Sequence, residues 1–571
     1  MATGGKASSS QLFIPKLVTV LREGYGFAQF RADFIAGLTV AIVALPLSMA
    51  LAIASGTTPD KGLMTAIVAG FLISAFGGSR FQIGGPTGAF VVVVFNVIAV
   101  HGYDGLVLAS AMAGIMLIGA GFLRVGSFIK YIPEPVVTGF TAGIAVIIAT
   151  SQIKDFFGIA LENEPAAFLD KIPALAGAIG TISPQTLVVG FGALALIVWL
   201  RSTRPNWPGF LIAVVLASFF VWLFALPTDT IGTRFAGLEP SFSIPAFPEI
   251  TMERIITLFP SAFTIAFLAG VESLLSAMVA DSMTGRRHRS NSELVAQGIA
   301  NCASAAVGGL PATGAIARTA ANIRAGAHGP VAGMLHAVFI LIFMAFAWPL
   351  VTYVPLAALA AVLLIVAWNM SEIEKFRHMM RAPMGDKAVL ILTFALTILV
   401  DLTVAIEVGV VLAAVLFMHR MSEAVEVQAH LNLVEEDVAD DAPRDFVPMQ
   451  EYDLPDGVAA SLIRGPFFFG VAMRLGETLD RIGATPKVLI VRMRAVPIID
   501  ATGVSALSSM IDRCERKGTK VIITALQPQP ARVLGDMGVL ARVTRAPDFP
   551  TAIDMARKMV AEMAAEAREE A

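Results

Sequence analysis

Residues 260–285 read PSAFTIAFLAGVESLLSAMVADSMTG, an apolar stretch with an acidic residue, Glu272, near its middle. A helix of this length and composition can cross a bilayer, which needs about 20 apolar residues. An ionisable side chain at membrane depth is costly, so we expect it to face a transport pathway or a partner within the protein. The stretch therefore predicts a membrane protein in which Glu272 has a function.

Two other stretches are interrupted by glycine and proline and are too short to cross a bilayer. Residues 77–96 read GGSRFQIGGPTGAFVVVVFN, and residues 308–326 read GGLPATGAIARTAANIRAG, which includes Arg318. Helices over 87–100 and 312–323 would be only about 21 and 18 Å long. Such a pair, in corresponding positions of two halves, is typical of a transporter's substrate site near the middle of the membrane.

The composition also indicates a protein that crosses the membrane many times. The chain has 571 residues, 56% of them hydrophobic and 15% charged, and its mean hydropathy is +0.75. The net charge of -3 gives no support for nucleic-acid binding. The sequence contains no nucleophile–base set, metal-ligand cluster or phosphate-binding loop, so we expect no enzyme, no cofactor and no bound metal.

Apolar segments occur fourteen times before residue 421. They cover residues 34–54, 63–78, 87–100, 106–123, 136–153, 185–201, 207–226, 258–281, 291–308, 312–323, 330–347, 352–370, 386–401 and 403–420. The short segments are the third and the tenth, which are equivalent if the chain contains two repeats of seven. Because seven is odd, the second repeat would be inverted. We therefore expect an all-α polytopic membrane protein with a 7+7 inverted repeat and half-helices at spans 3 and 10.

The C-terminal part has the composition of a soluble domain. After Arg420, strand-like residues 486–497 and 518–526 alternate with helix-like residues 503–518 and 550–570, which predicts a small α/β domain. Most basic loop residues lie on the cytoplasmic side if the N-terminus is inside, so both termini are expected in the cytoplasm. The expected domains are a cytoplasmic N-terminal segment (1–30), a membrane domain (31–421), a linker (422–445) and the α/β domain (446–571).

The interrupted segments provide helix starts that suit an anion. Pro86 cannot continue the preceding helix and favours the start of the next. The free N–H groups of a first helical turn, together with the helix dipole, bind anions without a charged side chain. The residues expected to bind substrate are Gly85, Pro86, Thr87, Gly88, Ala89, Thr313, Gly314, Ala315 and Arg318. The alternative is that the glycines only allow close packing of helices.

Glu272 and Ser276, one helical turn apart, are the expected coupling residues. Glu272 would accept a proton, or the two oxygen-bearing side chains would together bind Na⁺. Arg318 would either contact the anion or neutralise Glu272. In the second case, Glu272 would be a structural residue that never changes its charge.

The ninth apolar segment, residues 291–308, is expected to form a helix with several polar residues. Ser290 and Glu293 fit a capping box at its start. Gln297, Asn301 and Ser304 continue on one face at helical spacing. A polar face of this kind indicates contact with other parts of the protein rather than with lipid.

Thr502 lies at a strand-to-helix turn of the C-terminal domain, two residues after Asp500. A phosphate group is favourable at a helix N-terminus, so Thr502 is a candidate for regulatory phosphorylation. The alternative is that this turn only caps the helix.

These segments together resemble the SulP family of anion transporters over nearly the whole chain. The motifs that carry the resemblance are RADFIAGLTVAIVALPLSMALAIASG (31–56), GGSRFQIGGPTGAF (77–90), ADSMTGRRHRSNSELVAQGIAN (280–301), AIARTAANIRAGA (315–327) and the STAS-type IDATG (499–503). The resemblance implies a core domain of spans 1–4 and 8–11, a gate domain of spans 5–7 and 12–14, elevator-type transport, and a homodimer in a bacterial inner membrane. It also implies that Glu272 couples transport to a cation.

Within the family, residues 270–285 and 315–327 are most similar to bacterial four-carbon dicarboxylate transporters. We therefore expect proton-coupled import of a dicarboxylate such as succinate or fumarate. Sodium-driven bicarbonate relatives typically have Asp at the position of Glu272, which favours protons here. The alternatives are Na⁺-coupled bicarbonate transport, proton-coupled sulfate transport, or an uncoupled anion channel. The expected partners are the anion, the coupling ion, membrane lipid and a second copy of the chain.

Overall fold

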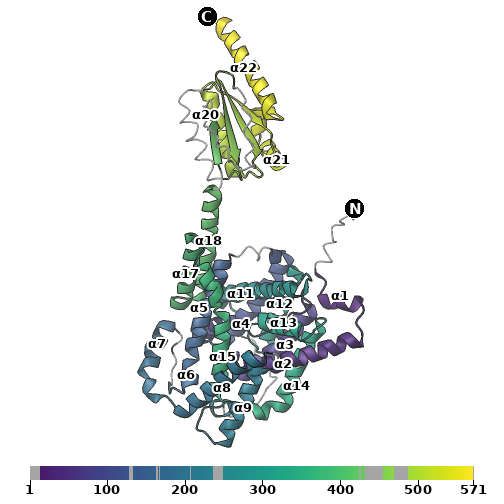
Figure 1. Cartoon of the computed structure of the whole chain (residues 1–571), viewed down its shortest axis with the longest axis vertical. Helices are drawn as coiled ribbons and strands as arrows, with labels where there is room; N and C mark the ends of the chain where they lie inside the picture. The colour runs from purple at the N-terminus through teal and green to yellow at the C-terminus, as the bar shows by residue number, and fades with distance from the viewer. Residues whose placement is uncertain are drawn as a thin grey trace. The chain divides into compact units, whose positions relative to one another are not determined.

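The protein is described by a computed structural model (Figure 1). The structure describes residues 13–127, 133–161, 165, 167–205, 207–235, 248–423, 426–430, 454–468 and 486–569. The chain divides into two compact units, Met1–Ala413 and Ala414–Ala571. Residues 1–12 of the expected N-terminal segment lie outside the described residues.

The chain before residue 424 is mostly helical, and a helix lies on each of the fourteen predicted segments; the last of these helices, α18, extends past Ala413 into the second unit. These helices are α2 (Phe27–Ala54), α3 (Pro59–Phe76), α4 (Ala89–Phe122), α5 (Glu134–Ser151), α8 (Pro184–Thr203), α9 (Gly209–Leu223), α11 (Met252–Thr284), α12 (Ser290–Ala306), α13 (Ile316–Arg324), α14 (Val331–Val351), α15 (Leu356–Met370), α17 (Met384–Leu399) and α18 (Leu402–Glu423). The third and fourth segments both fall on α4, which is broken at Gly102, where φ is 71°. Among the described residues, 9 helices are long and apolar enough to cross a membrane. The number of crossings stays a prediction.

Shorter helices connect these segments. They are α1 (Lys16–Arg22), α6 (Ile153–Phe157), α7 (Phe168–Gly177), α10 (Ile231–Arg234) and α16 (Ile373–Met379).

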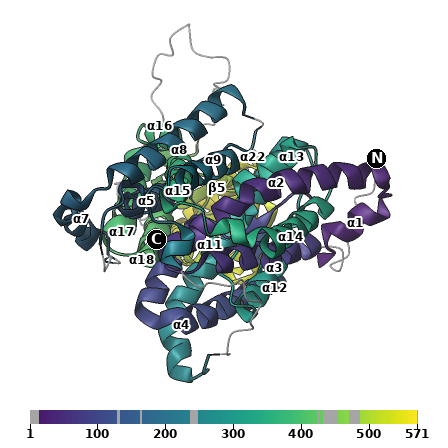
Figure 2. The same cartoon turned by 90° about the horizontal axis from the view of Figure 1, so that it is seen from below.

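The long helices pack in two groups. In one group, α12 packs on α3 and α4, α14 packs on α2 and α3, and α11 packs on α4 and α13. In the other group, α15 and α17 pack on α5, and α8 packs on α9 and α15. Figure 2 shows α5, α15 and α17 on one side, and α3, α12 and α14 on the other. The first group contains helices of the core domain that the resemblance implies, and the second contains helices of the gate domain; α2 of the first group also contacts α9 and α15 of the second.

Glycines allow helices α4 and α12 of the first group to pack closely against each other. A Cβ atom on Gly298 of α12 would lie 2.5 Å from the carbonyl oxygen of Gly114 on α4. A side chain at this position would therefore force the two helices apart. Glycines at such contacts are typical of helix packing in membranes.

The two interrupted segments meet as a short antiparallel pair. Strand β1 (Gly84–Gly85) pairs with β2 (Thr313–Gly314), with Gly84 opposite Gly314. The Ala315 N–H extends the pairing by donating to the Ile83 carbonyl at 2.8 Å. Because residues 313–315 are held extended by these bonds, α13 begins at Ile316, and its expected start at residue 312 is wrong. Helix α4 likewise begins at Ala89, two residues later than expected.

The second unit contains a five-stranded sheet with helices on both faces (Figure 1). The strand order is β3 (Glu426–His430), β4 (Val458–Arg464), β5 (Val488–Ala495), β6 (Lys520–Thr524) and β7 (Thr544–Ala546), with β3 antiparallel and the others parallel. Helices α20 (Ala501–Arg516) and α21 (Pro528–Asp536) cover one face, and α22 (Phe549–Glu569) covers the other. This confirms the expected α/β domain. Strand β3 falls within the expected linker 422–445, of which residues 424–425 and 431–445 lie outside the described part of the chain.

Candidate functional site

Glu272 lies on α11 and contacts the start of the first interrupted helix. The Thr87 hydroxyl donates to Glu272 Oε2 at 3.1 Å, and both side chains are partly exposed. Within the described ranges, no ion pair joins Glu272 to Arg318 or to any other cation. The structure therefore does not contain the Glu272–Arg318 pair that the sequence left open.

Ser276 is buried and contacts the second interrupted helix instead of Glu272. Its hydroxyl donates to Thr319 Oγ1 on α13 at 3.0 Å. The same Thr319 oxygen accepts the Ile83 N–H at 3.1 Å. These bonds hold α11, α13 and the residues before β1 together, so the structure gives Ser276 a positioning contact.

Arg318 is buried behind the β1–β2 pair, with 2% of its surface exposed. Its Nη2 donates to the Pro86 carbonyl at 2.5 Å, whereas Nε and Nη1 have no hydrogen-bond partner among the described residues. A Cβ atom on Gly85 would lie 2.6 Å from Nη1, so the guanidinium lies directly against the break before α4. A buried cation without a carboxylate partner is costly. The positive charge of Arg318 would therefore be stabilised by an anion bound beside it.

The remaining predicted substrate residues surround the same break. Gly88 and Ala315 are the N-cap residues of α4 and α13, and Ala89 is the first residue of α4. The Thr313 hydroxyl donates to the Ala269 carbonyl of α11 at 2.8 Å, one turn before Glu272. The first N–H groups of a helix have no partner within it, and the helix dipole adds positive potential there. The structure therefore brings two helix N-termini, Arg318 and Glu272 to one region.

A buried network that the sequence did not reveal supports this region. Gln82 Nε2 donates to the Ser273 hydroxyl at 3.0 Å, and Ser273 donates to Glu293 Oε1 at 3.2 Å. The other carboxylate oxygen of Glu293 accepts the N–H groups of Gly78 at 2.8 Å and Ser79 at 3.1 Å. Glu293 therefore links α12 to α11 and to the connection that leads into β1.

The predicted capping box at the start of α12 is wrong, because both of its residues bond elsewhere. The N-cap residue is Arg289, without a side-chain cap. Ser290 is 3.0 Å from His288 Nε2, and Glu293 makes the contacts described above. No local sequence pattern identifies Gly78 as the partner of Glu293, since 215 positions separate them.

The polar face of α12 contacts protein, as predicted. Asn301 donates from Nδ2 to the Ala312 carbonyl and accepts the Ala312 N–H at Oδ1, both at 2.8 Å. Ser304 donates to the Leu310 carbonyl at 2.7 Å. Gln297 donates to Glu293 Oε1 at 2.9 Å. This face therefore positions the segment that leads into β2.

Glu293→Ala is expected to lower the free energy of unfolding by about 3 kcal/mol or more, because it leaves several buried donors without an acceptor. Thermal unfolding of the purified protein in detergent measures the effect. Glu253→Ala is the control, since Glu253 is exposed in the first turn of α11. Equal melting temperatures for the two variants would contradict this role of Glu293.

Gly85→Ala is expected to impair anion binding by about tenfold or more. The new methyl group would displace the Arg318 guanidinium, and the φ of 150° at Gly85 is unfavourable for alanine. Gly192→Ala is the control, because no atom of the described residues lies within 4 Å of a Cβ at that position on α8. Anion binding to the purified variants distinguishes the two. Unchanged binding by Gly85→Ala would show that the position of Arg318 has no bearing on the site.

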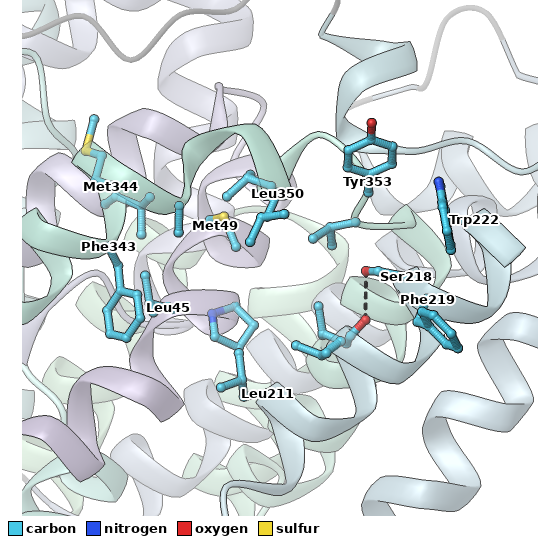
Figure 3. A pocket seen from close by; sticks show the side chains of 17 residues that line it. Leu45, Met49, Leu211, Ser218, Phe219, Trp222, Phe343, Met344, Leu350 and Tyr353 are labelled. Atoms are coloured by element: carbon cyan, nitrogen blue, oxygen red, sulfur yellow. Dashed lines mark hydrogen bonds between the residues drawn. The ribbon is translucent and has the colours of Figure 1, made fainter.

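A separate cavity of about 570 Å³ lies between α2, α3, α9 and α14. Figure 3 shows its mostly apolar lining, with Trp222 and Tyr353 at one side. The Ser218 hydroxyl in the wall donates to the Val214 carbonyl at 2.8 Å. None of the described residues that line this cavity is charged, so its lining does not suit an anion.

Thr502 is exposed in the first turn of α20. The Asp500 carboxylate caps this helix by accepting the Gly503 N–H at 2.7 Å. Capping is thus provided by Asp500, and the Thr502 side chain stays accessible.

Comparison with known proteins agrees with this architecture. Residues 30–393 match the sulfate permease family, and residues 453–552 match the STAS domain. A putative sulfate transporter, YvdB of Bacillus subtilis, is 39% identical over 523 residues, covering 91% of this chain and 96% of that protein. The bicarbonate transporter BicA of Picosynechococcus sp. is 31% identical and covers 90% of this chain and 92% of that protein.

Solved structures show the same fold. The transmembrane domain of a cyanobacterial bicarbonate transporter BicA superposes with a TM-score of 0.60 at 27% identity, covering 68% of this chain and 98% of that one. The murine anion transporter Slc26a9 in an inward-facing state gives a TM-score of 0.84 at 16% identity, covering 98% and 96%. The relatives are transporters and not enzymes. The chain therefore belongs to the sulfate permease family of membrane-spanning anion transporters and carries a C-terminal STAS domain.

Proposed function

We propose that the protein imports a small anion together with a proton, and that the anion binds where α4 and α13 begin. The observation that carries this proposal is the buried Arg318 guanidinium, which has two N–H-bearing nitrogens without a protein partner and no carboxylate counter-ion among the described residues. An anion at the two helix N-termini would supply the missing negative charge.

Glu272 is the proposed proton carrier. Its only hydrogen-bond partner in the described part of the chain is the Thr87 hydroxyl, at the same helix start that would receive the anion. An ionised Glu272 would repel the anion, whereas a protonated one would not. Anion binding and proton binding at Glu272 would therefore favour each other, which is the requirement for symport.

The substrate proposed first is a four-carbon dicarboxylate, on the resemblance of residues 270–285 and 315–327. Relatives named as sulfate and bicarbonate transporters support these two anions as the alternative substrates. All three are small oxyanions that accept hydrogen bonds from backbone N–H groups.

Transport would proceed by an elevator-type movement in a homodimer. The division of the long helices into two packed groups supports this mechanism, because β1, β2, Glu272 and Arg318 all belong to one of them. That group could carry the site across the membrane against the other as a rigid body. The exposed Thr502 hydroxyl is proposed as a site of regulatory phosphorylation in the STAS domain.

Uptake by proteoliposomes tests the substrate and the coupling ion together. Labelled succinate, sulfate and bicarbonate are offered separately, with either an inward proton gradient or an inward Na⁺ gradient. We expect accumulation of succinate with acid outside and no response to Na⁺. Accumulation of sulfate or bicarbonate without succinate would show that the dicarboxylate assignment is wrong. Accumulation driven only by Na⁺ would overturn the proton proposal.

A further inference from the structure

A second cavity, of about 660 Å³, lies between α5, α8 and the end of α15. Its lining is apolar except for Arg201 and Ser371. Both polar side chains lie at helix ends: Arg201 belongs to the last turn of α8, and Ser371 is the C-cap residue of α15. The polar groups thus gather where these helices end, and the apolar lining extends from there along the helices.

In the described part of the chain, Arg201 contacts a neutral partner and no acidic one. Its Nη1 donates to Asn369 Oδ1 at 2.7 Å, and the described residues place no carboxylate within 4.0 Å of it. The carboxylates of Glu134 and Glu372, which begin α5 and follow α15 in the chain, pair with Lys375 Nζ instead, at 3.0 and 3.3 Å. The positive charge at this end of the cavity is therefore available to an anionic group.

Trp368 lies at the same end of the cavity, with 65% of its surface exposed. Tryptophan is enriched where a membrane protein passes from the acyl chains to the headgroup level. A groove between membrane helices with a basic residue at this level suits a phospholipid headgroup. A small inorganic anion would satisfy Arg201 but would leave the apolar groove unfilled.

We propose that this cavity is a phospholipid site, in which an acyl chain lies along α5, α8 and α15 and the phosphate group contacts Arg201. The site is independent of the proposed function, because it contains none of the residues assigned to the anion or the proton. The bound lipid would pack against three helices of one group and would stabilise their arrangement.

Photolabelling of the full-length protein in nanodiscs tests the site. Two probes carry the same photoreactive acyl chain, and one is a phosphatidylglycerol whereas the other is a diacylglycerol without phosphate. Mass spectrometry then maps the labelled residues. We expect the phosphatidylglycerol probe to label the residues that line the cavity at least about fivefold more than the diacylglycerol probe does.

Two variants locate the headgroup and the acyl chain. Arg201→Gln is expected to remove the preference for the phosphate-bearing probe, whereas Arg204→Gln, three residues later and outside the cavity lining, is expected to keep it. Ala149→Phe, which fills the apolar part, is expected to reduce labelling by both probes.

The proposal is overturned if labelling is not enriched in the cavity, or if both probes label it equally in the unmodified protein. It is also overturned if Arg201→Gln keeps the preference. Crosslinking of two copies of the chain through this cavity would show that a second protomer occupies it instead.

Discussion

Glu272→Gln is expected to abolish gradient-driven accumulation of the anion while preserving its binding. Glutamine keeps an oxygen that can accept the Thr87 hydroxyl, but it cannot bind or release a proton at working pH. The variant would resemble the protonated carrier permanently. Accumulation in proteoliposomes under an inward proton gradient is expected to fall by about tenfold or more. Exchange of labelled for unlabelled anion, which needs no net proton movement, is expected to continue.

Glu253→Gln is the matched control, because Glu253 is an exposed carboxylate on the same helix. It is expected to accumulate anion at the rate of the unmodified protein. If the protein were an uncoupled anion channel, Glu272→Gln would leave the anion flux intact, because a channel needs no proton carrier. Normal proton-driven accumulation by Glu272→Gln would therefore remove Glu272 from the coupling mechanism.

Arg318→Gln is expected to weaken anion binding by about 30-fold or more. Removing one partner of a buried charged contact costs about 2 kcal/mol or more, which corresponds to this factor. The variant also loses the guanidinium that holds the Pro86 carbonyl. Equilibrium binding of the labelled anion to the purified protein measures the effect, and a melting curve shows whether the variant is folded.

Arg324→Gln is the control for the charge, because Arg324 is exposed at the end of the same helix α13. It is expected to bind the anion as the unmodified protein does. Arg318→Lys separates charge from geometry, since lysine keeps the charge and lacks the planar fork of donors. We expect it to recover part of the affinity. Full affinity in folded Arg318→Gln would show that the anion does not need this residue.

Much of the membrane unit could be predicted from the sequence because its signals are local. Apolar runs located the helices, and the glycines and prolines near Pro86 and Pro311 located the two interruptions. The equivalence of those interruptions in two repeats predicted that they belong to one site. The polar face through Asn301 predicted contact with protein, because a polar stripe is unfavourable in lipid.

The contacts that build the site could not be predicted, because they join residues far apart in the chain. Arg318 and Pro86 are 232 positions apart, and Glu293 and Gly78 are 215 apart. The later start of α13 has the same origin, since residues 313–314 are extended where residues 84–85 pair with them. Local propensity contains no information on such a partner.

The most direct test of proton coupling at Glu272 records the pH inside proteoliposomes while the anion is imported. The membrane potential is clamped, no pH gradient is imposed, and the anion found in the uptake assay is added outside. We expect the interior to become acidic in proportion to the anion taken up, and we expect no acidification with Glu272→Gln. Import of the anion at a constant internal pH, or acidification that persists in Glu272→Gln, would contradict the proposed mechanism.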